Sequence, residues 1–210
     1  MRNSEKKIAQ LLLQNKAIKL NPAKPFQWSS GWKSPIYCDN RKTLSYPDVR
    51  DFIRDEFIAV IKKHFKDVEG IAGVATGAIA HGVLVADRMH LPFLYVRSSA
   101  KSHGMKNQIE GVPRPGQRIV VVEDLISTGS SSLNAVEALR NEGCNVLGMV
   151  AIFNYGFKFS EEKFSKANCR LFTLSNYDAL LDLAIESGYI NAENLEILKK
   201  WRQDPENWPA

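Results

Sequence analysis

The chain has 210 residues, a formal net charge of +5 and three cysteines. This length can bury a full hydrophobic core and leaves little room for a second catalytic domain, so we expect one domain over residues 1–210. Basic residues are spread among acidic ones, which argues against a nucleic-acid partner. An odd number of cysteines without Cys-x-x-Cys spacing argues against a disulfide framework and a zinc site. The polar first ten residues and the lack of a long apolar run argue against a signal peptide and a membrane span, so we expect a cytoplasmic protein.

The expected elements alternate between helices and strands along the chain. A helix is expected from Ser4, which can cap it, and a second from about Pro47, where apolar residues repeat at helical spacing. In chain order there follow a strand at 71–75, a helix at 78–89, strands at 93–97 and 120–122, a helix from 133 to about 143, strands at 146–153 and 171–174, and helices at 179–185 and 192–201. This alternation predicts an α/β domain with a parallel sheet.

The segment VVVEDLISTGSSS at residues 120–132 joins a buried strand, two acids and a hydroxyl-rich loop that opens a helix. Free backbone N–H groups and the positive end of the helix dipole suit a phosphate in such a loop. Glu123 and Asp124 would repel that phosphate, so we expect them to accept hydrogen bonds from ribose hydroxyls of the same ligand. The pattern indicates a ribose 5-phosphate site. The alternative is a solvent-facing turn, in which acids and serines are ordinary.

Residues 98–118 interrupt the alternation with a long polar connection that contains three glycines and two prolines. Connections of this length inside a compact domain are usually functional lids or disordered segments. One interpretation is a solvated loop whose charges are ordinary surface charges. The other is a mobile lid that closes over a bound ligand.

The segment at 120–132 resembles the phosphoribosyl pyrophosphate (PRPP) motif of type I phosphoribosyltransferases. Two more segments, SSGWKSPIYCDNR at 29–41 and RSSAKSHG at 97–104, are similar to the orotate phosphoribosyltransferase family. The resemblance, from about residue 20 to about residue 180, implies the type I phosphoribosyltransferase fold: a central mostly parallel sheet flanked by helices, a small hood and a flexible lid. The N-terminal helix and segment 20–45 would contribute to the hood, and the lid would lie at about 98–116.

The resemblance also implies an activity and a set of site residues. PRPP and orotate would be the substrates, Mg²⁺ would be held mainly through PRPP, and a homodimer would place each lid in the neighbouring site. The residues implied to bind PRPP are Arg97, Lys101, His103, Glu123, Asp124, Leu125, Ile126, Ser127, Thr128, Gly129, Ser130 and Ser131. Those implied in catalysis are Lys101, His103 and Asp124. Those implied to contact orotate are Ser127, Tyr37 and Cys38, although Tyr37 could also belong to a strand that enters the core.

The turn at 73–80, with Thr76 and Gly77, is expected on the pyrophosphate side. Several family cations have no counterpart here: Ser29, Gly77, Ser98 and the region of Tyr155 stand where some members carry Lys or Arg. Candidate replacements are Lys33, Arg41 and Lys106. Two other functions stay open, a phosphoribosyltransferase for another base and a non-catalytic regulator that senses a nucleotide on the same fold.

Overall fold

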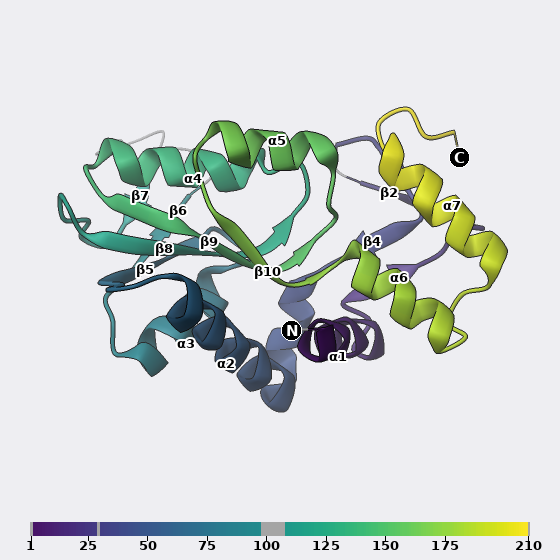
Figure 1. The fold of residues 1–210 in the computed structure, drawn as a ribbon, viewed down its shortest axis with the longest axis horizontal. Helices are drawn as coiled ribbons and strands as arrows, with labels where there is room; N and C mark the ends of the chain where they lie inside the picture. The colour runs from purple at the N-terminus through teal and green to yellow at the C-terminus, as the bar shows by residue number, and fades with distance from the viewer. Residues whose placement is uncertain (1, 29, 98–107, 210) are drawn as a thin grey trace.

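The computed structural model describes residues 2–28, 30–97 and 108–209. Its centre is a six-stranded sheet in the order β10-β9-β8-β5-β6-β7 (Figure 1). β7 runs antiparallel to β6, and the other neighbouring strands are parallel. The strands are β5 Gly70–Val74, β6 Phe93–Val96, β7 Ile109–Glu110, β8 Arg118–Ile126, β9 Asn145–Asn154 and β10 Leu171–Asn176. The predicted α/β fold with a mostly parallel sheet is confirmed.

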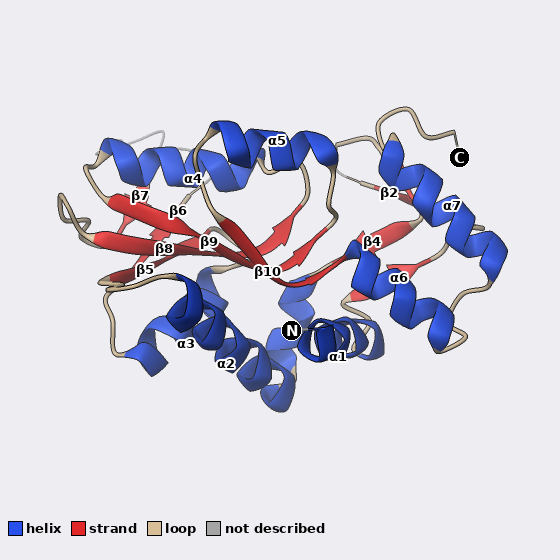
Figure 2. Ribbon diagram, viewed as in Figure 1, coloured by secondary structure: helices blue, strands red, loops and turns tan. Residues whose placement is uncertain are grey.

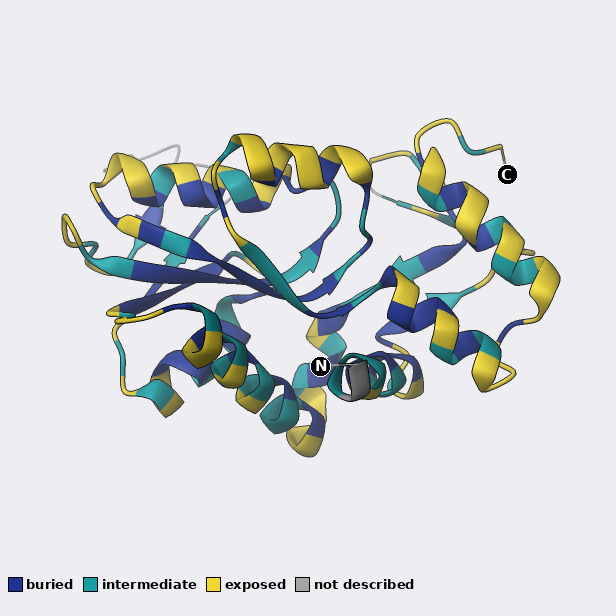
Figure 3. Cartoon of the chain, in the orientation of Figure 1, coloured by how far each residue is buried: buried dark blue, intermediate teal, exposed yellow. Residues whose placement is uncertain are grey.

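Helices cover both faces of the sheet (Figure 2). One face carries α1 Arg2–Gln14, α2 Pro47–His64 and α3 Ile79–Met89, and the other carries α4 Ser130–Asn141 and α5 Lys158–Lys166. Val120 and Val122 belong to the core cluster on the α2 side, and Val121 belongs to the cluster on the α4 side. Side chains alternate along a strand, so three consecutive valines fill both cores. Figure 3 shows the central strands buried and the outer helix faces exposed.

Short antiparallel strands and a 3-10 helix form a smaller unit beside the main sheet (Figure 1), which we call the hood. It consists of β1 Ile18–Leu20, β2 Phe26–Gln27, β3 Lys33–Ser34, β4 Ile36–Cys38 and η1 Asn40–Ser45. Two C-terminal helices, α6 Tyr177–Glu186 and α7 Ala192–Gln203, lie next to it. Asn176 and Asn191 cap these helices through their side chains, because each accepts a hydrogen bond from a backbone N–H of the first turn.

Several elements differ from the sequence-based expectation. The short strands β1 to β3 and the helix η1 were not expected, and α1 begins at Arg2, so Ser4 lies within the helix and does not cap it. α5 was not expected, although Phe157, Ser160 and Phe164 are buried at helical spacing and carry its signal. Within the range expected for the lid, β7 pairs with β6, and Ile109 is buried at the sheet edge, so this part of the range is not loop. Residues 98–107 of the expected lid lie outside the described residues. In the described part of the chain, no helix has the length and apolar character needed to cross a membrane.

Candidate active site

A cleft of about 570 Å³ lies between the hood and the carboxyl ends of the sheet strands. In open α/β sheets ligands commonly bind at this edge, because the loops that follow the strands meet there. The hood and the loops after β8 and β9 both supply walls. The lining residues are Gln27, Trp28, Ser30, Trp32, Tyr37, Cys38, Leu125, Ser127, Thr128 and Tyr155.

The loop after β8 is shaped by Gly129, the N-cap residue of α4. Gly129 has φ +76°, and an added Cβ would meet the Phe164 ring at 2.9 Å. Glycine at this position therefore relieves both backbone strain and a packing conflict. No side chain caps the helix there, so the first amides of α4 face the loop together with the hydroxyls of Thr128 and Ser130. Such an end of a helix suits a phosphate.

The two adjacent acids of β8 do different things. Glu123 is 4% exposed, and its carboxyl accepts hydrogen bonds from the Ser132 Oγ at 2.8 Å and from the Asp124 backbone N–H at 2.9 Å. Burial, together with the neighbouring Asp124 charge, raises the pKa of Glu123 well above its ordinary value. Asp124 is half-buried on the opposite side of the strand, because successive side chains of a strand point to opposite faces. Glu123 therefore turns toward α4 and away from the position expected for ribose hydroxyls. That Asp124 accepts those hydroxyls stays a prediction.

The turn after β5 comes close to Asp124. Gly77 lies in this turn, and a Cβ at this position would collide with the Asp124 carboxylate. Thr76 beside it is exposed, and a cis peptide bond joins Ala75 to Thr76. The turn that the sequence places on the pyrophosphate side therefore lies against the acid expected on the sugar side.

Aromatic rings form the opposite wall of the cleft. Trp28 is stacked with Trp32 at 6.3 Å between ring centroids and lies 5.2 Å from Tyr155. Trp201 of α7 meets Trp28 edge-on at 5.6 Å and is fully buried. Its indole N–H donates to the Lys33 backbone carbonyl at 3.3 Å, which fastens α7 to β3. The result is a flat, largely apolar wall that suits a planar ring.

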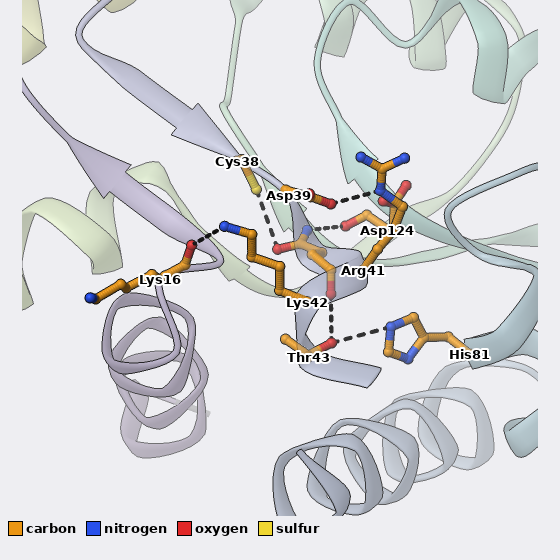
Figure 4. A network of polar contacts seen from close by, with 9 residues as sticks. Lys16, Cys38, Asp39, Arg41, Lys42, Thr43, His81 and Asp124 are labelled. Atoms are coloured by element: carbon orange, nitrogen blue, oxygen red, sulfur yellow. Dashed lines mark hydrogen bonds and ion pairs between the residues drawn. The ribbon is translucent and has the colours of Figure 1, made fainter. Parts of the chain in front are cut away.

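A buried hydrogen-bond network joins the hood to β8 and α3 (Figure 4). The Asn40 amide donates to the Asp124 carbonyl at 2.6 Å and accepts from the Cys38 thiol at 3.3 Å. The Thr43 hydroxyl donates to the Asn40 carbonyl at 2.6 Å and lies 3.4 Å from the His81 Nε2. Burial lowers the pKa of His81 to about 4 and raises that of the Cys38 thiol, so both side chains are neutral near pH 7. The network therefore positions Asp124 without a charge of its own.

The comparisons with known proteins agree with this geometry. The family model described as phosphoribosyl transferase domain matches residues 53–179. An orotate phosphoribosyltransferase from Bacteroides thetaiotaomicron is 58% identical over 210 residues, which covers 100% of this chain and 99% of that relative. This chain belongs to the orotate phosphoribosyltransferase family. The expected family and enzyme class are thereby confirmed.

Solved structures of this family share the fold. Orotate phosphoribosyltransferase from Aeropyrum pernix superposes with a TM-score of 0.76 and 28% identity over 88% of this chain and 99% of that chain. The Mycobacterium tuberculosis enzyme, solved in complex with PRPP, has a TM-score of 0.65 and 23% identity over 87% of this chain and 99% of that chain.

Compared with the residues expected for an orotate phosphoribosyltransferase, the cleft brings together Tyr37, Cys38 and Ser127, with Leu125 and Thr128 beside them. Ser130 and Ser131 are exposed in the first turn of α4. Ile126 is fully buried, so its side chain cannot reach a ligand, and its carbonyl accepts the Tyr155 backbone N–H at 3.1 Å.

The expected cations are only partly described. Arg97 follows β6, and its guanidinium lies 3.6 Å from the Glu110 carboxylate. Arg41 donates to Asp39 at 2.7 Å and is exposed near Asp124 (Figure 4). The positions outside the described residues are Ser29, Ser98, Lys101, His103 and Lys106.

The region near Tyr155 holds an aromatic ring where some members of the family carry an arginine. Tyr155 is 1% exposed and packs against Phe157, Trp28 and Trp201. Sequence reasoning missed these aromatic residues as parts of the site. The spacing of Trp28 and Trp32 within WSSGW was a visible signal, whereas Trp201 comes from the far end of the chain and leaves no local one.

Proposed function

We propose that this chain transfers the 5-phosphoribosyl group from PRPP to orotate, giving orotidine 5′-phosphate and pyrophosphate in the formation of pyrimidine nucleotides. One observation carries this proposal: the aromatic cleft opens directly onto Ser127 and Thr128, the first residues of the phosphate loop. A flat base in the cleft and a sugar phosphate in the loop would therefore meet at the ribose C1 atom. Positioning of this kind can supply much of a transfer reaction's barrier reduction.

On the sugar-phosphate side, the loop from Thr128 to Ser131 would hold the 5′-phosphate through amides and hydroxyls. Asp124 would accept the ribose hydroxyls, with its backbone held by Asn40. Glu123 would position the loop without contacting the ligand, because its carboxyl accepts hydrogen bonds from the Asp124 backbone N–H and the Ser132 hydroxyl. Leu125 and Ile126 would contribute mainly backbone to PRPP binding.

On the base side, Tyr37, Cys38 and Ser127 would contact orotate, and Trp28 and Trp32 would supply ring faces. The orotate ring nitrogen is already nucleophilic in the anionic base, so the site does not need a strong general base. Neutral donors such as a serine hydroxyl and backbone amides suit the carbonyl oxygens of the base. The cleft in this way favours a planar polar anion.

On the leaving-group side, Arg97, Lys101 and His103 would stabilise the charge that develops on pyrophosphate as the bond to C1 of ribose breaks. In the described part of the chain, no cluster of three or more His, Cys, Asp or Glu side chains is arranged to hold a metal. Mg²⁺ suits this donor set, because it retains waters and binds substrate phosphates together with one or two carboxylates, here Asp124. When bound, Mg²⁺ supplies further positive charge to the pyrophosphate oxygens.

The remaining parts of the proposal concern the oligomeric state and the cellular location. A homodimer in which each lid serves the neighbouring site, and a cytoplasmic location, follow from the family pattern. A related enzyme for another base would share the phosphate loop but would not need the hood segment 29–41. A nucleotide-sensing regulator would not need Lys101 and His103.

An assay with alternative bases tests the proposal. The protein is incubated with PRPP, Mg²⁺ and orotate, and then with adenine, guanine, xanthine or uracil in place of orotate. We expect release of pyrophosphate with orotate alone. Turnover of a purine with orotate untouched would assign the chain to another base, and no turnover with any base would favour the regulator.

A further inference from the structure

Helix α5 packs directly on the phosphate loop. The position of a Cβ on Gly129 is taken by the Phe164 ring at 2.9 Å and by the Ser160 Oγ at 3.0 Å. Phe164 is 4% exposed and Ser160 is 1% exposed, so this contact is closed to solvent. Figure 1 shows α4 and α5 side by side on the same face of the sheet. The contact fixes α5 relative to the first turn of α4.

The same helix places a lysine at the loop. Lys163 Nζ donates to the Ser130 Oγ at 3.0 Å and approaches the Thr128 carbonyl at 3.5 Å. The ammonium also lies 5.8 Å from the centre of the Phe159 ring, at a distance typical of a cation–π contact. An ammonium group has three N–H donors, so these two contacts leave one for a ligand. Lys163 is exposed, which keeps its charge accessible from solvent.

The charge balance of the loop shows what this lysine could do. Residues 120–132 include Glu123 and Asp124 but no Lys, Arg or His. A sugar 5-phosphate adds about two negative charges near neutral pH. Helix amides supply only partial positive charge, whereas an ammonium within hydrogen-bond distance supplies a full one.

We propose that Lys163 is the cation of the 5′-phosphate subsite and binds the phosphate of a sugar 5-phosphate together with the loop at 128–131. The inference rests on the assignment of this loop under the proposed function, and it adds a residue that lies outside the three segments of family resemblance. Lys163 acts in ground-state binding, because the 5′-phosphate stays unchanged while the bond at C1 of ribose breaks. Its loss should therefore raise KM for PRPP and leave kcat nearly unchanged.

The test compares Lys163→Met with Lys163→Arg and with Lys166→Met, a matched loss of an exposed lysine one turn further along α5. Calorimetric titration with ribose 5-phosphate should show binding about tenfold weaker for Lys163→Met, as for a lost hydrogen bond to a charged group. Lys163→Arg should stay within about threefold of the original protein, and Lys166→Met should match it. The KM for PRPP should follow the same order. Raising the salt concentration should weaken binding less in Lys163→Met than in the original protein.

A loop variant, Thr128→Val, separates this inference from the loop assignment. If Thr128→Val weakens ribose 5-phosphate binding and Lys163→Met does not, Lys163 has no role at the phosphate and the loop assignment stands. If neither variant weakens it, the loop assignment and the Lys163 role both fall. Turnover of orotate in the base assay then still decides the proposed function by itself. Equal unfolding midpoints for all variants would show that the comparison concerns binding and not folding.

Discussion

The two sides of the cleft consist of different kinds of chemical groups. The base side consists of aromatic rings that pack on one another, with Trp201 and Tyr155 almost completely buried. The sugar-phosphate side consists of amides and short polar side chains, with Asp124, Ser127 and Thr128 half-buried and Ser130 exposed. Buried aromatic area contributes to folding as well as to binding, whereas exposed hydrogen-bonding groups contribute little to stability. Substitutions on the base side should therefore reduce stability as well as binding, whereas substitutions on the sugar-phosphate side should reduce activity with little loss of stability.

Asn40 lies where the two sides meet. Its amide accepts the Cys38 thiol on the base side and donates to the Asp124 carbonyl on the sugar side. Asn40 is 1% exposed, so water does not reach its amide. Loss of either hydrogen bond would therefore leave a buried polar atom without a partner, which is costly. Neutral groups in this way tie the hood to β8 beside the cleft.

Removing Trp201 should produce the largest effect on stability. Trp201→Ala leaves a cavity behind Trp28 and Tyr155, and we expect a loss of about 3–5 kcal/mol in the free energy of unfolding. KM for orotate should rise more than KM for PRPP, because the rings that face the base lose their support. Chemical denaturation and steady-state kinetics measure these two quantities.

Trp208→Ala is the matched control, since Trp208 is only partly buried at the edge of the same core. It should cost less than half as much stability and leave KM for orotate unchanged. The loss of stability for Trp201→Phe should lie between those of Trp201→Ala and Trp208→Ala. Equal stability losses at Trp201 and Trp208 would contradict the central place given to Trp201 in the aromatic wall.

Gly77→Ala should produce the opposite pattern, a large loss of activity with little loss of stability. The added Cβ collides with the Asp124 carboxylate, which can move because Asp124 is half-buried. We expect kcat/KM to fall by about 100-fold, as for displacement of a group that positions the reacting sugar. The free energy of unfolding should change by about 1 kcal/mol or less.

A double-mutant cycle with Asp124→Ala identifies the cause. Asp124→Ala alone should also reduce kcat/KM by about 100-fold, and it removes the carboxylate with which the new Cβ collides. Adding Gly77→Ala to that variant should therefore cost almost nothing more. If the two losses multiply instead, Gly77 acts on the pyrophosphate side independently of Asp124.

The difference between the two sides also explains which parts of the site could be predicted from the sequence and which could not. The phosphate loop is one contiguous segment, so strand, acids, glycine and helix could be recognised together at 120–132. The aromatic wall combines Trp28 with Tyr155 and Trp201. Each of these two residues lies more than half of the chain away from Trp28 and meets it only in the fold. Lys163 was missed for the same reason, since it belongs to α5. The roles of Glu123 and Asp124 could not be separated, because the strand's alternation decides which side each acid faces.

The smallest expected effect tests that separation of the two acids. Because burial raises the pKa of Glu123 well above 4.5, the folded state binds a proton that the unfolded state has released at intermediate pH. The stability contribution of Glu123 is therefore full below pH 4.5 and is lost as pH rises through the folded-state pKa. Gln imitates the protonated carboxyl, so Glu123→Gln should keep its stability as pH rises and exceed the original protein by about 1 kcal/mol at alkaline pH.

The measurement is the difference in free energy of unfolding between the original protein and Glu123→Gln from pH 4.5 upward. His81 also contributes to the pH dependence of stability in part of this range. Its folded-state pKa of about 4 lies below its ordinary 6.5, so its contribution is lost as pH falls, opposite to that of Glu123. His81 is present in both proteins, so its contribution cancels in the difference. A difference for Glu123→Gln that does not change with pH would mean that burial does not raise the pKa of Glu123 in the folded protein.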